Sequence, residues 1–201
     1  MSVAIELPRF TGFENRVFDA QASFRAIMDA LANPGRIETI ALAPEAPSML
    51  APALSCAALT LIDHDTPVYF DAAFRADREI AGFLGFHTGC RFVEDASRAA
   101  FALIGEAAQC PDLASFAQGT LEYPDRSTTL ILQVESLETE TGLTLSGPGI
   151  KETSSLCAAP LWPGFADQLR ANRARFPQGV DLLFCAGNRI VGVPRSTHIE
   201  G

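Results

Sequence analysis

The chain has 201 residues, of which 48% are hydrophobic, and this combination suits one domain with an apolar core. Its formal charge of −9, without any cluster of Lys and Arg, excludes general nucleic-acid binding, which needs many cationic contacts to phosphate. The sequence has neither a signal-peptide pattern nor an apolar run of about 18 residues. It therefore predicts a cytoplasmic protein that does not cross a membrane.

The first part of the chain alternates between helical and extended patterns. Apolar residues at helical spacing predict a helix over 20–32, with Asp19 as its N-cap and "NPG" (33–35) as its end. The alternating segment "RIETIAL" (36–42) predicts a strand. The apolar segment "SMLAPALSCAALTLID" (48–63) predicts a buried helix with a proline near its start.

The middle of the chain continues this alternation. Three strands are predicted, at "DTPVYF" (65–70), "RFV" (91–93) and "AAFALIG" (99–105). A helix over 75–85 separates the first two of them. "PDLASFAQG" (111–119) begins with proline and ends with glycine, which predicts a short helix.

The last third is predicted to contain two hairpins with a helix over 164–175 between them. In the first hairpin, "ETETG" (138–142) connects "TTLILQVESL" to "LTLSGPG". In the second, Gly187 and Asn188 form a tight turn between "VDLLFCA" and "RIVGVP".

Strands that alternate with helices predict an α/β fold in which helices cover both faces of the sheet. The hairpins make that sheet mixed. The sequence has no long linker and no internal repeat. We therefore expect a three-layer α/β/α sandwich that forms a single domain over residues 1–201.

Cysteine usage predicts reduced thiols. The five cysteines are odd in number, widely spaced and mostly set among apolar neighbours. No pair has the C-x-x-C spacing of a zinc or redox site. We expect buried free thiols rather than disulfides.

Most motifs for cofactor chemistry are absent. "SGPGIKE" (146–152) lacks the spacing of a phosphate-binding P-loop, and "GFLGFHTG" (82–89) is better explained as a helix end and a turn. "DHD" (63–65) is typical of a turn, and the three histidines lie far apart in the sequence. Lys151 is the one lysine among the fifteen Lys and Arg residues, and it falls in a predicted loop. We expect neither a metal nor another cofactor.

Two polar segments remain as candidates for a site. "YPDRSTTLIL" (123–132) places Arg126 and Ser127 at the entry to an apolar strand, and "PRSTHIE" (194–200) places Arg195, Thr197 and His198 at the exit of the last strand. Arginine can grip an anion with two parallel hydrogen bonds, while hydroxyls and imidazole add further hydrogen-bonding groups. These five residues either bind an anionic ligand, dock a partner, or merely cap the strands.

The order of several segments makes the chain resemble a known family. "FDAQASFRAIMDALANPGRI", "LTLIDHDTPVYF", "FHTG", "GTLEYPDRSTTLIL", "LSGPGI", "FPQGVDLLF" and "VPRSTHIE" closely resemble the PhnH family. Members are subunits of the bacterial carbon–phosphorus lyase core complex for phosphonate utilisation. The likeness covers almost the whole chain from Phe18 onward.

The resemblance implies a function in a complex with PhnG, PhnI, PhnJ and PhnL. That complex supports the formation of α-D-ribose 1-methylphosphonate 5-triphosphate from ATP and methylphosphonate. The resemblance also implies the fold of the PLP-dependent transferases, without PLP. Because such subunits work in assemblies, we expect a homodimer in isolation and no activity of the chain alone. The alternative is a free-standing enzyme or binding protein for a small phosphorylated ligand, and the family supplies no catalytic residue to transfer.

Overall fold

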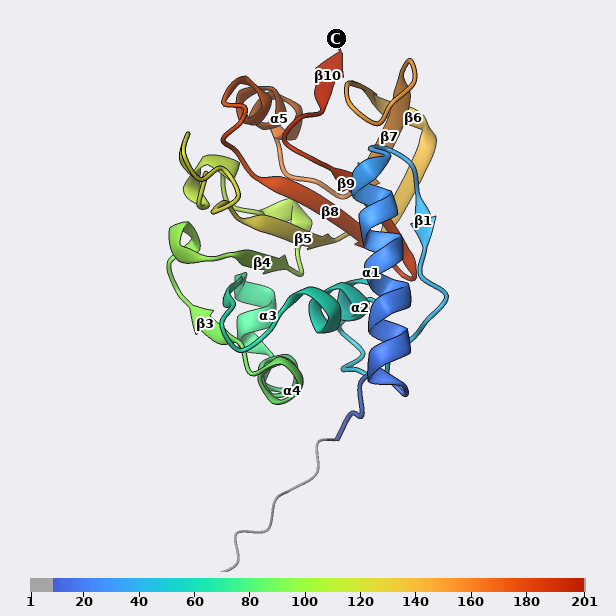
Figure 1. The fold of residues 1–201 in the computed structure, drawn as a ribbon, viewed down its shortest axis with the longest axis vertical. Coiled ribbons are helices and arrows are strands. Elements are labelled where there is room, and N and C mark those ends of the chain that lie inside the picture. Colours follow the sequence, from blue (N-terminus) through green and yellow to red (C-terminus); the bar gives the residue numbers. More distant parts are fainter. Residues whose placement is uncertain (1–8, 201) are drawn as a thin grey trace, which may run out of the picture.

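The structure is a computed structural model that describes residues 9–200. The α-helices are α1 (Arg16–Ala32), α2 (Pro52–Leu61), α3 (Ala72–Ala76), α4 (Arg78–Thr88) and α5 (Phe165–Ala174). The strands are β1 (Glu38–Thr39), β2 (Pro67–Phe70), β3 (Arg91–Val93), β4 (Phe101–Ile104), β5 (Thr129–Gln133), β6 (Ser136–Ser146), β7 (Ser154–Ala159), β8 (Asp181–Ala186), β9 (Arg189–Val193) and β10 (His198–Glu200). Figure 1 shows their arrangement.

The fold is built on a seven-stranded mixed sheet in the order β1-β9-β8-β5-β4-β2-β3. Its five strands from β8 to β3 run parallel, whereas β9 is antiparallel to β8 and β1 is antiparallel to β9. The turn from β8 to β9 uses Gly187, whose φ of 57° lies in the left-handed region that favours glycine. The predicted α/β class, the mixed sheet and this second hairpin are therefore confirmed.

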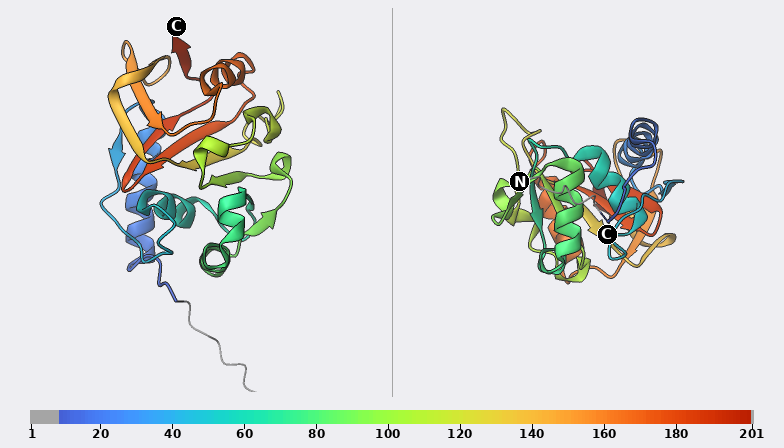
Figure 2. Two further views of the ribbon diagram at one scale, coloured as in Figure 1. Left: turned by 180° about the vertical axis from the view of Figure 1, so that it is seen from behind. Right: turned by 90° about the horizontal axis from the view of Figure 1, so that it is seen from below.

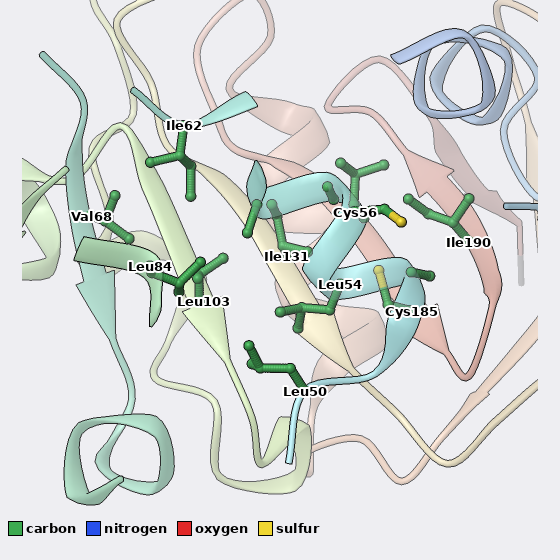
Figure 3. Packing of buried hydrophobic residues seen from close by; sticks show 14 of the residues in the cluster. Leu50, Leu54, Cys56, Ile62, Val68, Leu84, Leu103, Ile131, Cys185 and Ile190 are labelled. Atoms are coloured by element: carbon green, nitrogen blue, oxygen red, sulfur yellow. The ribbon is translucent and has the colours of Figure 1, made fainter. Parts of the chain in front are cut away.

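One face of the sheet is covered by α1, α2 and α4. Alternate strand residues point to this face, and they pack against apolar residues of those helices. Figure 3 shows Leu54 of α2 close to Ile131 and Cys185 of the sheet, and all three side chains are fully buried. The largely buried helix predicted from "SMLAPALSCAALTLID" thus forms the middle of this layer, over Pro52–Leu61.

The opposite face is covered by α5, short 3-10 turns and a second sheet in the order β10-β6-β7. These elements lie at the same end of the molecule in both views from the side (Figures 1 and 2). Leu137, Leu145 and Leu156 of the small sheet are buried in the same apolar cluster as Phe184 of β8. The second outer layer is thus part sheet and part helix, where the sequence predicted helices.

The first predicted hairpin is wrong. β5 belongs to the large sheet, where it lies between β4 and β8. "ETETG" is not a turn: it lies inside the continuous strand β6, which has a bulge between Glu138 and Leu143 and pairs with β7. The sequence prediction missed β7 because "SSLCAA" has neither β-branched nor aromatic residues.

Several element boundaries also differ from the predictions. The N-cap of α1 is Asn15, whose side chain accepts from the N–H of Phe18, while Asp19 lies in the first turn and accepts from the N–H of Asn15. Residues 75–85 fall in two helices, because Asp77 ends α3 and caps α4. The strand predicted over 36–42 pairs only at Glu38–Thr39, and the helix predicted over 111–119 is a single 3-10 turn at Leu113–Ser115.

All five cysteines lie within the described residues, and all are free thiols. Four are buried, and Cys157 is half-buried. The prediction of mostly buried, unpaired cysteines is therefore confirmed. Over residues 9–200, every helix is too short or too polar to cross a bilayer.

Candidate functional site

The two candidate segments meet in space at one end of the central strands of the large sheet. β5 and β8 are parallel, so both begin at this end of the sheet, and β9 runs antiparallel and finishes there. Residues 123–128 enter β5, and residues 194–197 leave β9. The topology thus joins segments that are about 70 positions apart in the chain, as the contact between Ser127 and Arg195 shows.

Arg195 holds this junction together. Its Nε donates to Asp181 Oδ1 at 3.1 Å, and its Nη2 donates to the other carboxylate oxygen, Oδ2. Nη1 donates to the carbonyl of Pro124 at 2.7 Å, and Nη2 donates to Ser127 Oγ at 2.5 Å. Its backbone N–H also donates to Asp181 Oδ1 at 2.8 Å. The side chain is only 13% exposed, so Arg195 fastens the start of β8 to the segment before β5.

This geometry disagrees with the expectation that Arg195 grips an anionic ligand. The fork of the guanidinium is occupied by the carboxylate of Asp181, and a bidentate ligand would have to displace it. Asp181 was not predicted as a site residue, although it stands in the segment "FPQGVDLLF", two residues after a glycine and at the start of an apolar strand. The signal available in the sequence was a carboxylate at the start of one strand, which the sheet can place close to the residues that follow the end of another strand.

Three hydroxyl residues of the two segments are buried. Ser127 is 8% exposed and accepts from Arg195. Thr128, next to it, is fully buried and donates through Oγ1 to the carbonyl of Ala99 at 2.6 Å. Thr197 is 4% exposed, and its Oγ1 has no hydrogen-bond partner within the described part of the chain. None of these hydroxyls stands free at the surface.

Arg126 and His198 lie outside the Arg195 junction. The guanidinium of Arg126 stacks on Tyr123, with its Cζ 4.1 Å from the ring centre. His198 Nε2 accepts from the Nε and Nη2 of Arg173, at 3.2 and 3.0 Å. Because a guanidinium only donates, the ring nitrogen must be the acceptor in this pair. Arg173, which is not among the site residues predicted from the sequence, stacks in turn on Phe176.

These groups, which are exposed except for the half-buried Arg173, form what we call the arginine–aromatic surface. Gln178 donates to the carbonyl of Gly119 at 3.0 Å and Arg175 to Gln118 at 3.3 Å, so the loop before β5 lies against the segment after α5. Large apolar side chains are exposed on both: Leu121 by 74%, Tyr123 by 47% and Phe176 by 51%. The surface is made of Leu121, Tyr123, Arg126, Arg173, Phe176 and His198.

The opposite end of the large sheet, where the parallel strands have their carboxyl ends, has different chemistry. There the buried carboxylate of Asp71 accepts from the N–H groups of Gly105 and Glu106, at 2.8 and 2.9 Å. A cavity of ≈ 330 Å³ lies beyond β4 and β5, and its polar lining includes Glu106 and Glu135. Ligands of open α/β sheets usually bind at the carboxyl ends of the strands, which lie at this end of the sheet. The candidate residues therefore lie at the other end of the parallel strands.

Nothing in residues 9–200 gathers three or more His, Cys, Asp or Glu side chains into a potential metal site. His64 lies in an exposed turn, His87 bonds the carbonyl of Phe10, and His198 bonds Arg173. Lys151 lies on an exposed bend between β6 and β7. Burial raises the pKa of Cys56 to about 11 and that of Cys110 to about 12, so both thiols stay protonated near neutral pH.

Comparisons with known proteins match almost all of the described chain. The model of a family described as "Bacterial phosphonate metabolism protein (PhnH)" matches residues 11–200. A protein of Rhizobium meliloti (strain 1021), named alpha-D-ribose 1-methylphosphonate 5-triphosphate synthase subunit PhnH, is 40% identical over 188 residues, which cover 94% of each chain. A putative C-P lyase subunit protein, HtxG of Stutzerimonas stutzeri, is 29% identical over 186 residues, which cover 90% of this chain and 85% of its own.

The chain belongs to the PhnH family. The family predicted from the sequence segments is thus confirmed. Three of those segments meet at the Arg195 junction, because Ser127 and Asp181 bind Arg195. A fourth, "LSGPGI", lies beside the last of them, since β10 pairs with β6 and His198 stands opposite Ser146. In this member of the PhnH family, part of the segment pattern therefore encodes a structural junction.

Proposed function

We propose that this chain is a subunit of a carbon–phosphorus lyase complex in organic phosphonate catabolism. In that role it supports the formation of α-D-ribose 1-methylphosphonate 5-triphosphate from ATP and methylphosphonate. The observation that carries the proposal is the 40% identity, over 94% of each chain, to a subunit of the synthase that is named for this product. The HtxG relative, named as a putative C-P lyase subunit, supports the same role.

Within this function, the chain's own contribution is docking and support. The partners are PhnG, PhnI, PhnJ and PhnL, and the isolated chain has no activity of its own. Arg126 and His198 contribute to docking through the arginine–aromatic surface, which combines exposed aromatic rings with arginines. These residue types are enriched at protein interfaces. Arg195, Ser127 and Thr197 shape the junction beneath that surface.

The contacts of Arg195 favour docking over the alternative of a free-standing protein for a small phosphorylated ligand. That alternative relied on Arg126, Arg195 and His198, with the two arginines as anion-binding groups. Arg195 is already paired with Asp181, and Arg126 lies on an exposed ring. A ligand site would need both guanidinium groups to leave these positions.

Four further parts of the proposal extend the sequence predictions. The purified chain alone forms a homodimer, and the protein works in the cytoplasm, a reducing compartment that suits its five free thiols. The likeness of the fold to the PLP-dependent transferases stays a prediction from the family resemblance. Likewise, the assignment of residues 1–201 to one domain stays a prediction.

The test is complementation in a bacterium whose own PhnH gene is deleted. We expect this chain to restore growth on methylphosphonate as the phosphorus source, and a tagged copy to purify together with PhnG, PhnI and PhnJ. Growth on inorganic phosphate is the control for general health. A chain that is soluble and abundant but restores no growth and captures no partner would refute the proposal. Turnover of a phosphorylated substrate by the purified chain alone would favour the alternative.

A further inference from the structure

The outer side of α1 is apolar although it faces solvent. Val17 is 76% exposed, Phe18 68%, Phe24 48% and Met28 36%. Val17, Phe24 and Met28 follow one another at spacings of seven and four residues, so they fall on one stripe of the helix, and Phe18 lies beside it. The helix packs against α2 and β9 through a different face, which contains the buried Ile27.

An outer helix face of this kind is unusual, because the exposed face of a surface helix is normally polar. α5 of the same chain follows the rule: its exposed residues are Asp167, Arg170, Ala171 and Ala174, which are charged or small. Neighbouring apolar side chains that are all exposed mark a surface that another molecule covers. Figures 1 and 2 show α1 at the periphery of the molecule, so its outer side is accessible to such a molecule.

Arg25 lies on the flank of the stripe. It is exposed, and no group within residues 9–200 accepts a hydrogen bond from its side chain or forms an ion pair with it. Together these residues form what we call the outer α1 surface, which consists of Val17, Phe18, Gln21, Phe24, Arg25 and Met28. Phenylalanine, methionine and arginine are enriched at protein interfaces, whereas lysine and glutamate, which are depleted there, do not occur on this surface.

These side chains define the chemistry of the molecule that covers them. A partner that lies over Phe18 and Phe24 also takes Arg25 out of water, and a buried guanidinium is costly unless an acceptor compensates it. A carboxylate is the acceptor that fits a guanidinium best, because two parallel hydrogen bonds can form. The partner therefore presents apolar side chains and at least one acidic residue.

The shape of the surface favours a helix as the covering element. The backbone groups of α1 are bonded within the helix, so the surface has no strand edge to extend, and only side chains are available for contact. From Val17 to Met28 the stripe is about 16 Å long, or about three turns. A second helix of similar length covers such a stripe by packing its ridges of side chains into the grooves of α1.

We propose that the outer α1 surface docks an amphipathic helix of another subunit, which faces it with apolar side chains and places a carboxylate opposite Arg25. The inference rests on the proposed function, since it requires that the chain works in a multi-subunit complex. The surface is separate from the arginine–aromatic surface, because α1 covers one face of the large sheet and α5, with Arg173, covers the other.

Polar replacement of the two aromatic rings tests the contact. A tagged chain with Phe18→Gln and Phe24→Gln should stay folded, because both rings are already exposed and glutamine is a good helix former. We expect the recovery of PhnG, PhnI and PhnJ with it to fall at least about tenfold. Phe92→Gln is the matched control. Phe92 is 46% exposed but lies on β3, at the opposite edge of the large sheet from β1 and β9, against which α1 packs.

Charge reversal provides a second variant in case the double replacement disturbs the fold. Arg25→Glu leaves both rings in place and brings a carboxylate against the carboxylate of the partner, so recovery of the partner subunits should fall in the same direction. Arg91→Glu makes the same change at an exposed arginine of β3 and should leave recovery unchanged. Urea denaturation of each purified variant checks that the chain is folded.

Cross-linking identifies the helix and its acidic residue. Lys151 is the one lysine of the chain, so Arg25→Lys combined with Lys151→Arg leaves a single lysine, at position 25. In the purified complex, a carbodiimide activates a carboxylate, and a lysine amine in contact with it displaces the activating group to form an amide. We expect a link from position 25 to an Asp or Glu in a helix of another subunit, located by mass spectrometry. Arg91→Lys combined with Lys151→Arg should give no link to that residue.

Unchanged recovery of the partner subunits by both α1 variants would overturn the inference, and so would an intact complex without a link at position 25. A link to a carboxylate outside a helix, to a second copy of the chain or to residues 1–8 of the same chain would also overturn it, because each identifies a different occupant. These outcomes are distinguishable from a failure of the proposed function. If the unchanged chain captures no partner and restores no growth on methylphosphonate, the subunit role fails; if it does both, and the α1 variants do so equally well, only the outer α1 surface is refuted.

Discussion

At the scale of single residues, the two arginines of the candidate segments have opposite surroundings. The side chain of Arg195 is 13% exposed and paired with a carboxylate, whereas Arg126 lies on an exposed aromatic ring. Removing a buried partner of an ion pair leaves an uncompensated charge, whereas an exposed arginine contributes little to stability. The two positions therefore make a matched pair for mutation.

We predict that Arg195→Lys lowers the free energy of unfolding by about 2 kcal/mol, because an ammonium cannot make the fork of bonds to Asp181, Ser127 and Pro124 together. Urea denaturation measures the change. Arg126→Lys should change stability by less than about 0.5 kcal/mol. Equal stability losses for the two variants would contradict the structural role of Arg195.

At Thr197, the effect of one side-chain hydroxyl on stability can be measured separately from its effect on function. Its buried Oγ1 has no hydrogen-bond partner among the described residues, and such a hydroxyl costs stability. Thr197→Val replaces it with a methyl group of similar shape, so we expect unchanged or slightly higher thermal stability. If growth on methylphosphonate is also unchanged, the hydroxyl has no ligand; lost growth with intact stability would assign it one.

The buried thiols predict a loss of stability at alkaline pH. Burial raises the folded-state pKa of Cys56 to about 11 and that of Cys110 to about 12, whereas the ordinary pKa of a cysteine thiol in the unfolded chain is about 9.0. Their contribution is fully present below pH 9 and is lost as the pH rises toward 11 and 12, because only the unfolded chain ionises in that window. Urea midpoints should fall above pH 9, and Cys56→Ala should reduce the slope. A flat profile to pH 11 would contradict this.

At the scale of elements, α1 approaches the sheet closely at one glycine. A Cβ added to Gly192 of β9 would lie 2.6 Å from the carbonyl oxygen of Ala30 in α1. The contact explains why β9 reads "RIVGV" rather than an uninterrupted apolar run. Because the three atoms nearest to this Cβ all belong to the backbone of α1, side-chain movement cannot relieve the overlap.

We therefore expect Gly192→Ala to destabilise the fold by about 1–3 kcal/mol through overpacking between α1 and β9. Gly82 in α4 is the control, since an added Cβ there meets nothing within 4 Å. Gly82→Ala should raise stability by about 0.5–1 kcal/mol through helix propensity. Thermal unfolding of the two variants measures both effects; a neutral Gly192→Ala would show that α1 can shift away from the sheet.

The elements that the sequence predicts well are those with strong local signals. α2, β5, β8 and β9 have apolar runs or clear turns at their ends, so pattern alone locates them. β7 and β10 are weak in isolation and exist because β6 supplies a template on each side. "ETETG" resembles a turn in composition, yet the bulge at Glu138 and Leu143 lets it continue as strand.

The sequence predicted where the candidate site lies better than it predicted which groups pair with each other there. Polar residues at the start of one strand and at the end of another do meet, because the sheet topology places both at the same end of the sheet. The pairing of Arg195 with Asp181 depends on which strands are neighbours, and no pattern within a single segment contains that information. Likewise, the partner of His198 is Arg173 on α5, which is distant in the chain.

At the scale of the whole molecule, the arginine–aromatic surface can be tested as an interface. We predict that Tyr123→Ala combined with Arg126→Ala leaves the chain folded but reduces the recovery of PhnG, PhnI and PhnJ with it by at least about tenfold, since aromatic and arginine anchors dominate interface energetics. Met49→Ala removes a side chain that is 52% exposed and lies outside that surface, so it should change nothing. Full recovery of partners by the double variant would exclude this surface from docking.

The strand order has a consequence for how the protein is made on the ribosome. β8 lies next to β5 near the centre of the large sheet, and β9 connects β1 and α1 to it, yet β8 and β9 follow every other strand of that sheet in the sequence and are synthesised after them. While they are still inside the exit tunnel, the apolar face of α1 has no sheet to pack against, and one side of β5 has no neighbour. The nascent chain therefore keeps the sheet-facing side of α1 and one side of β5 uncovered until β8 and β9 emerge, which makes completion of the large sheet a late event in folding and the unfinished chain a natural client for chaperones.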